Sequence, residues 1–228
     1  MKLEQLFYNG QLHACFQKAQ LQQDSPFAQQ VIALYERYQL ANIPRYTMRE
    51  EQAIERADET YVEQDEVLAI REITEEEQFV ARTRQLEERA RTGTDQERAQ
   101  SFFTQAQLFL FAHHYEESVH CFLQAVKYNP NKAVYYGLAA QTMQRLDYTP
   151  FEILGYLERA IDLDEQNARW HWNRALILVE LYKSLQHDAF LEQALIALED
   201  ALACCRQEQK SLKGAIENTL ENMRQYIF

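Results

Sequence analysis

The sequence predicts an all-α protein built from antiparallel helix pairs that stack into a solenoid. Gly and Pro are scarce, with five and four copies in 228 residues, which disfavours β folds that are rich in turns. The good helix formers Gln, Glu, Arg, Ala and Leu dominate the composition. Apolar residues recur at helical spacing in paired short segments, and such pairs must bury their apolar faces against neighbours.

Residues 1–45 are expected to form an N-terminal helical segment of two or three short helices. Gly10 interrupts the first apolar pattern, which then resumes. Ser25 and Pro26 start a further helix as N-cap residue and first-turn proline. Pro44 ends the segment. Because the spacing around Gly10 also suits a helix pair, the segment is open to interpretation as a degenerate further repeat.

Residues 46–98 form an acidic segment, which we interpret as helical or linker in character. Sixteen Asp or Glu stand against eight Arg over residues 49–98. Such charge runs usually form a solvated helix face or a linker; the alternative is an acidic surface that meets a basic partner. The capping box Thr74–Glu77 predicts the start of a helix that runs to Arg91.

Residues 99–228 are expected to form a separate helical domain, opened by a second capping box at Thr94–Glu97. The apolar pattern predicts seven helices with short turns. They are arranged as three pairs and one terminal capping helix, over residues 99–132, 133–167, 168–206 and 210–227. The turn of the third pair is expected to be lengthened near Leu181–Asp188.

The first of these pairs carries small and aromatic residues at regular positions. Small residues let two helices approach closely, aromatic residues fill the space between pairs, and a proline ends the second helix. The residues in this pattern are Phe102, Ala106, Phe109, Tyr115, Phe122, Ala125 and Pro130. The pattern resembles a tetratricopeptide repeat (TPR), a helix–turn–helix unit of about 34 residues. Ser118 departs from the family by replacing a small alanine. The resemblance covers residues 99–228 and weakens from the first unit to the third.

The TPR resemblance implies a concave groove lined by the first helices of successive units. Outward positions on those helices are the candidate partner-binding residues: Phe103, Gln107, Leu110, Phe111, Gln141, Arg145, Arg169, Trp172 and Asn173. The alternative is that the upstream part of the chain covers the aromatic members of this set. The carboxylate clamp of one TPR subtype is not expected, because Phe103, Gln107 and Leu138 stand where it needs Lys or Asn.

Charge and cysteine content restrict the partners and the compartment. A net charge of −12 makes nucleic acid and anionic membranes poor partners. No segment approaches the roughly 20 apolar residues of a membrane span, and the first residues lack the apolar run of a signal peptide. The four cysteines have no metal-type spacing, which favours free thiols in a reducing, cytoplasmic setting.

No motif in the sequence indicates catalysis. His113, His114, His120 and Cys121 gather around one turn, but without an HExxH pattern we expect no metal site. The sequence has no phosphate-binding loop, no GxGxxG and no GxSxG. We therefore expect no catalytic residues and no cofactor.

Three functional hypotheses follow. The first is a cytoplasmic protein-interaction module, acting as adaptor, scaffold or secretion-type chaperone, that binds a peptide or helix of another protein in the groove. The second is an acidic sequestering or immunity-type protein that binds a basic partner by electrostatic complementarity. The third is an enzyme without a recognisable motif. Homo-oligomerisation is left open.

Overall fold

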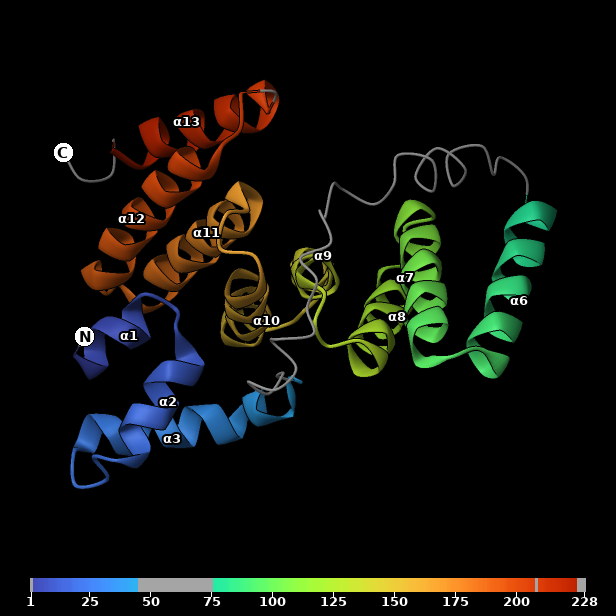
Figure 1. Ribbon diagram of the computed structural model, residues 1–228. Helices are drawn as coiled ribbons and strands as arrows, with labels where there is room; N and C mark the ends of the chain where they lie inside the picture. Colours follow the sequence, from blue (N-terminus) through green and yellow to red (C-terminus); the bar gives the residue numbers. More distant parts are fainter. Residues whose placement is uncertain (1, 45–75, 208, 225–228) are drawn as a thin grey trace. The chain divides into compact units, whose positions relative to one another are not determined.

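The computed structural model describes residues 2–44, 76–207 and 209–224 (Figure 1). All regular structure in these ranges is helical, which confirms the predicted all-α fold of TPR-like helix pairs. The chain divides into two compact units. The discontinuous unit joins Met1–Ile43 to Tyr148–Phe228, and the central unit is Pro44–Asp147. The three segments expected from the sequence divide the chain differently and stay a prediction.

The central unit is a run of helices that each pack on the next: α6 (Glu76–Thr92), α7 (Asp95–Phe111), α8 (Tyr115–Tyr128) and α9 (Ala133–Met143). Helix α7 begins with the predicted capping box. The Glu97 carboxylate accepts the backbone N–H of Thr94 at 2.8 Å, and the Thr94 hydroxyl accepts that of Glu97 at 3.4 Å. The capping box predicted at Thr74–Glu77 begins outside the described residues.

Helices α7 and α8 approach each other closely at two small residues. Ala106 and Ser118 are both fully buried, and the Ser118 hydroxyl donates a hydrogen bond of 2.7 Å to the Ala106 carbonyl. The serine that departs from the family pattern therefore has a partner, so its burial leaves no polar group unsatisfied. Phe103 fills the space next to this contact, with its ring 5.9 Å from that of Phe122 and 4.7 Å from that of Tyr135.

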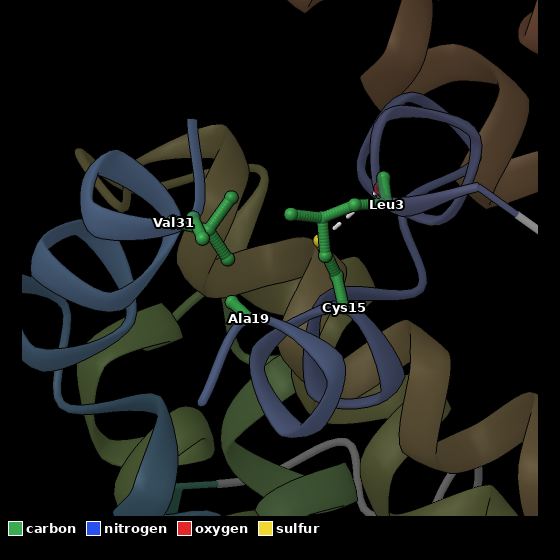
Figure 2. Packing of buried hydrophobic residues seen from close by; sticks show 5 residues of the cluster. Leu3, Cys15, Ala19 and Val31 are labelled. Carbon is green, nitrogen blue, oxygen red and sulfur yellow. Dashed lines mark hydrogen bonds between the residues drawn. The ribbon is translucent and has the colours of Figure 1, made fainter. Parts of the chain in front are cut away.

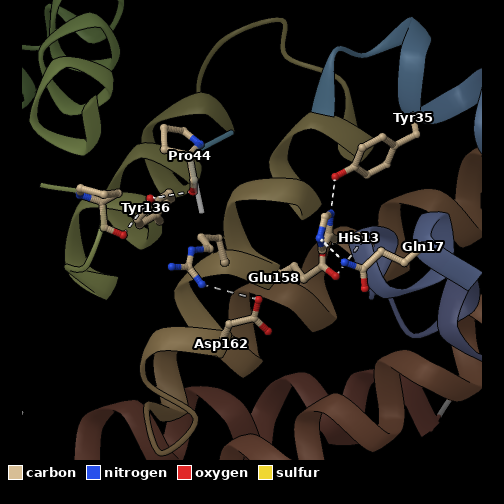
Figure 3. Close-up of polar contacts among 9 residues, drawn as sticks. His13, Gln17, Tyr35, Pro44, Tyr136, Glu158 and Asp162 are labelled. Carbon is tan, nitrogen blue, oxygen red and sulfur yellow. Dashed lines mark hydrogen bonds and ion pairs between the residues drawn. The ribbon is translucent and has the colours of Figure 1, made fainter. Parts of the chain in front are cut away.

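The turn between α8 and α9 is fixed by Tyr136. Helix α8 ends at Tyr128 and Pro130 follows in the turn, as the sequence predicts. The fully buried Tyr136 places its hydroxyl 3.0 Å from the carbonyl oxygen of Pro130 and 2.9 Å from that of Pro44 (Figure 3). A buried hydroxyl needs such partners, and these two hold the turn and the chain at Pro44 against α9.

The discontinuous unit contains two groups of helices. The N-terminal group is α1 (Leu3–Tyr8), α2 (Leu12–Gln20), α3 (Pro26–Arg37) and a 3₁₀ turn (Leu40–Asn42). The C-terminal group is α10 (Pro150–Leu163), α11 (Ala168–Leu185), α12 (Asp188–Cys204) and α13 (Lys210–Arg224). Ser25 and Pro26 take the predicted N-cap and first-turn positions of α3, although the Ser25 side chain makes no capping bond.

The lengthened turn expected in the third helix pair is wrong. Helix α11 runs to Leu185, so most of the segment Leu181–Asp188 extends the helix. Leu181 is buried, so continuing the helix through this residue removes its apolar side chain from water. Gln186 then ends the helix in the left-handed conformation, with φ of 53°. The turn consists of Gln186 and His187.

The N-terminal helices enclose a small core of their own. Its buried members are Leu3, Cys15, Ala19, Ala28 and Val31 (Figure 2). The Cys15 thiol lies 3.5 Å from the Leu3 carbonyl oxygen, and burial raises the pKa of this thiol to about 12. Cys15 is therefore a packing residue, held in its protonated form at neutral pH.

Two glycines allow the N-terminal segment to lie directly on α10. Gly10, with φ of 74°, turns the chain between α1 and α2, and a Cβ there would lie 3.2 Å from a methyl group of Leu154. A Cβ on Gly155 would lie 2.7 Å from the terminal methyl group of Ile43. A Cβ at either position would therefore require Leu154 or Ile43 to shift, and at Gly10 the positive φ would add backbone strain.

Glu158 of α10 caps helix α2 across this contact. The backbone N–H of His13, in the first turn of α2, donates to both carboxylate oxygens of Glu158, at 2.9 and 3.0 Å (Figure 3). The N-cap residue Gln11 supplies no side-chain bond of its own. A carboxylate at a helix N-terminus satisfies an unpaired N–H group and interacts favourably with the helix dipole. Glu158 thus anchors the N-terminal helices to α10.

Glu158→Gln tests this anchor. The variant keeps an acceptor oxygen but removes the charge and buries amide protons, so we expect the free energy of unfolding to fall by about 1–3 kcal/mol. Urea unfolding followed by circular dichroism measures the change. Glu192→Gln, on an exposed position of α12, is the matched control and should shift stability by less than about 0.5 kcal/mol. Equal stability of the two variants would contradict the capping role.

Candidate partner-binding site

A cavity of about 540 Å³ lies in the central unit, where α7 and α9 end. Its size falls within the range of small-ligand and side-chain pockets. Its lining comes from the end of α7, the turn after it, the start of α8, and the end of α9 with the turn that follows: Leu110, Phe111, His113, Tyr115, Gln141, Thr142 and Arg145. Four of these were predicted as partner-binding residues, namely Leu110, Phe111, Gln141 and Arg145. The structure therefore brings these four together.

The sharp end of α7 exposes the apolar wall of the cavity. His113 adopts the left-handed conformation, with φ of 62°. The backbone N–H of His114 donates to the Phe109 carbonyl at 2.9 Å, and that of His113 donates to the Leu110 carbonyl at 3.2 Å. This is a Schellman-type helix end, which satisfies the last carbonyl groups within the turn. Phe111, the last helical residue, remains 55% exposed.

Tyr115 contacts the Arg145 side chain at the polar side of the cavity. The guanidinium carbon of Arg145 lies 5.3 Å from the centre of the Tyr115 ring, within cation–π range. One guanidinium nitrogen also donates to the Tyr115 hydroxyl at 3.4 Å, and that hydroxyl lies 2.9 Å from Nδ1 of His113. These contacts connect the start of α8 with the turn after α9. Of the seven lining residues, Arg145 alone belongs to the charged types Arg, Lys, Asp and Glu.

Two predicted residues of α7 lie outside the cavity lining. Phe103 is 3% exposed and packs against Phe122 and Tyr135, so its expected outward position is wrong. Gln107 is half-buried one turn before Leu110, and its side-chain amide atoms are buried without a hydrogen-bond partner among the described residues. Phe103 is a core residue of the central unit, and Gln107 borders the core.

The remaining predicted residues lie on α11, in the discontinuous unit. Asn173 is 4% exposed, so its expected outward position is also wrong. Trp172 is half-buried, and its indole N–H donates to the Thr219 hydroxyl of α13 at 3.2 Å. Arg169 is half-buried in the first turn of α11. The contact from α13 shows that the C-terminal helix covers part of Trp172.

Sequence reasoning missed three lining residues. The sequence placed His113 in a histidine cluster and Tyr115 in the repeat pattern, and neither position gives a periodic signal for a side chain directed into this cavity. Thr142 lies four residues after Leu138, and its hydroxyl donates to the Leu138 carbonyl at 2.8 Å. Its spacing of three residues from the predicted Arg145 could have identified it.

The described residues show neither a metal centre nor a transmembrane helix. No group of three or more His, Cys, Asp or Glu side chains in these ranges is placed to hold a metal ion. Around the turn where the histidines gather, His114 lies 3.7 Å from Glu117. None of the helices within the described ranges has both the length and the apolar character needed to cross a bilayer.

Comparison with known proteins gives matches among solved structures. No protein-family description matches the sequence, and no curated protein matches it. Among solved structures, the chain is similar to the TPR domain of Arabidopsis OM64. The two share 18% sequence identity and a TM-score of 0.46, over 56% of this chain and 98% of that domain.

Phe103→Ala and Phe111→Ala distinguish the core residue from the surface residue. Truncating the buried Phe103 leaves a cavity, so we expect the free energy of unfolding to fall by about 3–5 kcal/mol. Truncating the exposed Phe111 should change it by less than about 1 kcal/mol. Urea unfolding of both variants measures the difference. Similar losses in the two variants would contradict the assigned positions.

Proposed function

We propose that this chain is a protein-interaction module that binds another protein through the cavity surface at the ends of α7 and α9. The observation that carries the proposal is the exposed Phe111 ring beside a cavity that also displays Arg145. Aromatic and arginine side chains are the residues that most often dominate binding energy at protein interfaces. The proposal is a binding function without covalent chemistry, as adaptor, scaffold or chaperone.

The arrangement of the cavity supports capture of a side chain from a partner. Leu110 and Phe111 offer an apolar wall, while Gln141 of α9 and Arg145 in the turn after it offer hydrogen-bond donors. A concave apolar surface with a few polar groups is typical of sites that bind a peptide or helix. Four free cysteines are compatible with the cytoplasmic setting that we also propose.

The second hypothesis, sequestration of a basic partner, rests on another part of the chain. Twelve Asp or Glu stand against two Arg over residues 50–77, most of which lie outside the described ranges. Residues 79–98 carry five Arg against four Asp or Glu. The charge argument therefore applies to the stretch before α6, and salt-sensitive binding would favour it.

Phe111→Glu tests the first hypothesis in a capture experiment. The wild-type chain, Phe111→Glu and the control Ile196→Glu are used as bait in native lysate, with quantitative mass spectrometry. Ile196 is a matched control because it is 44% exposed, on α12 of the other unit. We expect a partner retained by the wild type and Ile196→Glu to fall at least about tenfold with Phe111→Glu, since a charge in an apolar contact is costly.

Two outcomes would count against the proposed site. Retention of every partner by Phe111→Glu would contradict binding at this surface. Release of the partner from the wild type between about 0.1 and 0.5 M salt, with no effect of Phe111→Glu, would favour sequestration by the acidic stretch.

A further inference from the structure

We infer that the cavity recognises an internal segment of a partner protein in which a bulky apolar side chain lies beside an Asp or Glu side chain. The inference rests on the proposed function and specifies the chemistry of the partner. The apolar side chain would pack against Leu110 and Phe111, and the carboxylate would pair with the guanidinium group of Arg145. The evidence for each half of this motif is separate.

The apolar half follows from exposure and room. Phe111 keeps 55% of its surface exposed while Leu110 next to it is half-buried, so the wall is apolar and accessible. A cavity of about 540 Å³ has room for an aromatic or large aliphatic side chain. Burying such a side chain against this wall would remove apolar surface of both proteins from water.

The acidic half follows from Arg145. The Arg145 side chain is exposed. It contacts the neutral side chain of Tyr115. The guanidinium group therefore retains N–H donors for an anion, and stacking on Tyr115 limits the orientations it must lose on binding. Over residues 79–147, eight Arg or Lys stand against seven Asp or Glu, so this part of the chain carries nearly balanced charge.

The backbone around the cavity favours a side-chain carboxylate over a chain terminus. Terminal carboxylates are commonly held by several free backbone N–H groups. Here the N–H groups of Ala112, His113 and His114 bond to carbonyl groups of α7, and those of Gln144 and Arg145 bond to carbonyl groups of α9. The charged donor at the cavity is the guanidinium group of Arg145, which suits a carboxylate at the end of a partner side chain.

Defined peptides test this chemistry on the full chain. The reference probe is an acetylated and amidated eight-residue peptide with one phenylalanine and a glutamate three residues later. Companion peptides replace the glutamate by glutamine or lysine, or the phenylalanine by alanine. A fifth peptide ends in phenylalanine with a free carboxylate. Amide NMR titration reports both the affinity and the residues whose signals move.

We expect the reference peptide to move signals of residues 110–115 and 141–145. Glutamine in place of glutamate should weaken binding by about threefold to tenfold, and lysine should weaken it further, because an exposed ion pair contributes modestly. Alanine in place of phenylalanine should weaken it more than glutamine does. Arg145→Met should abolish the preference for glutamate over glutamine, whereas Arg91→Met, an exposed arginine on α6, should preserve it.

Each other outcome overturns the inference in a defined way. Equal affinity for the glutamate and glutamine peptides removes the acidic half. Tighter binding of the peptide with a free terminal carboxylate replaces the internal motif by a chain end. Absence of shifts at residues 110–115 and 141–145 with every peptide removes the inferred motif. None of these results decides the proposed function, which the capture experiment with Phe111→Glu tests independently.

Discussion

The close contact of α7 with α8 determines where the residues of the candidate site lie. Ala106 and Ser118 leave no space between the two helices, and the Ser118 hydroxyl bonds to the Ala106 carbonyl at 2.7 Å. Phe103, one turn earlier on α7, is thereby enclosed with Phe122. Phe111, five residues beyond Ala106, lies past the contact, where α7 ends. The same packing therefore buries one aromatic side chain and exposes the other.

Much of this fold could be predicted from the sequence, because the signals involved are local. Helical periodicity predicts the seven helices from α7 to α13. Thr94 forms a capping box with Glu97 at the start of α7, and Thr149 forms one with Glu152 at the start of α10. Such signals depend on neighbours three or four residues apart. The length of α11 was not predicted, because the burial of Leu181 depends on residues far along the chain.

The features that sequence analysis missed depend on tertiary contacts. Phe103 and Phe111 are both aromatic residues of one helix, and packing against Phe122 and Tyr135 distinguishes the buried ring from the exposed one. The capping of α2 by Glu158 joins residues 145 positions apart and has no local signature. The same holds for the contact of Tyr115 with Arg145, which connects α8 to the turn after α9.

Site-specific photo-crosslinking tests the central claim most directly. A benzoylphenylalanine placed at Phe111 is compared with the same residue at Ile196, an exposed apolar position outside the proposed site. Illumination in cells should give a discrete adduct with one partner protein from position 111, and none from position 196. Absence of an adduct at position 111, or the same adducts from both positions, would contradict a binding surface at the ends of α7 and α9.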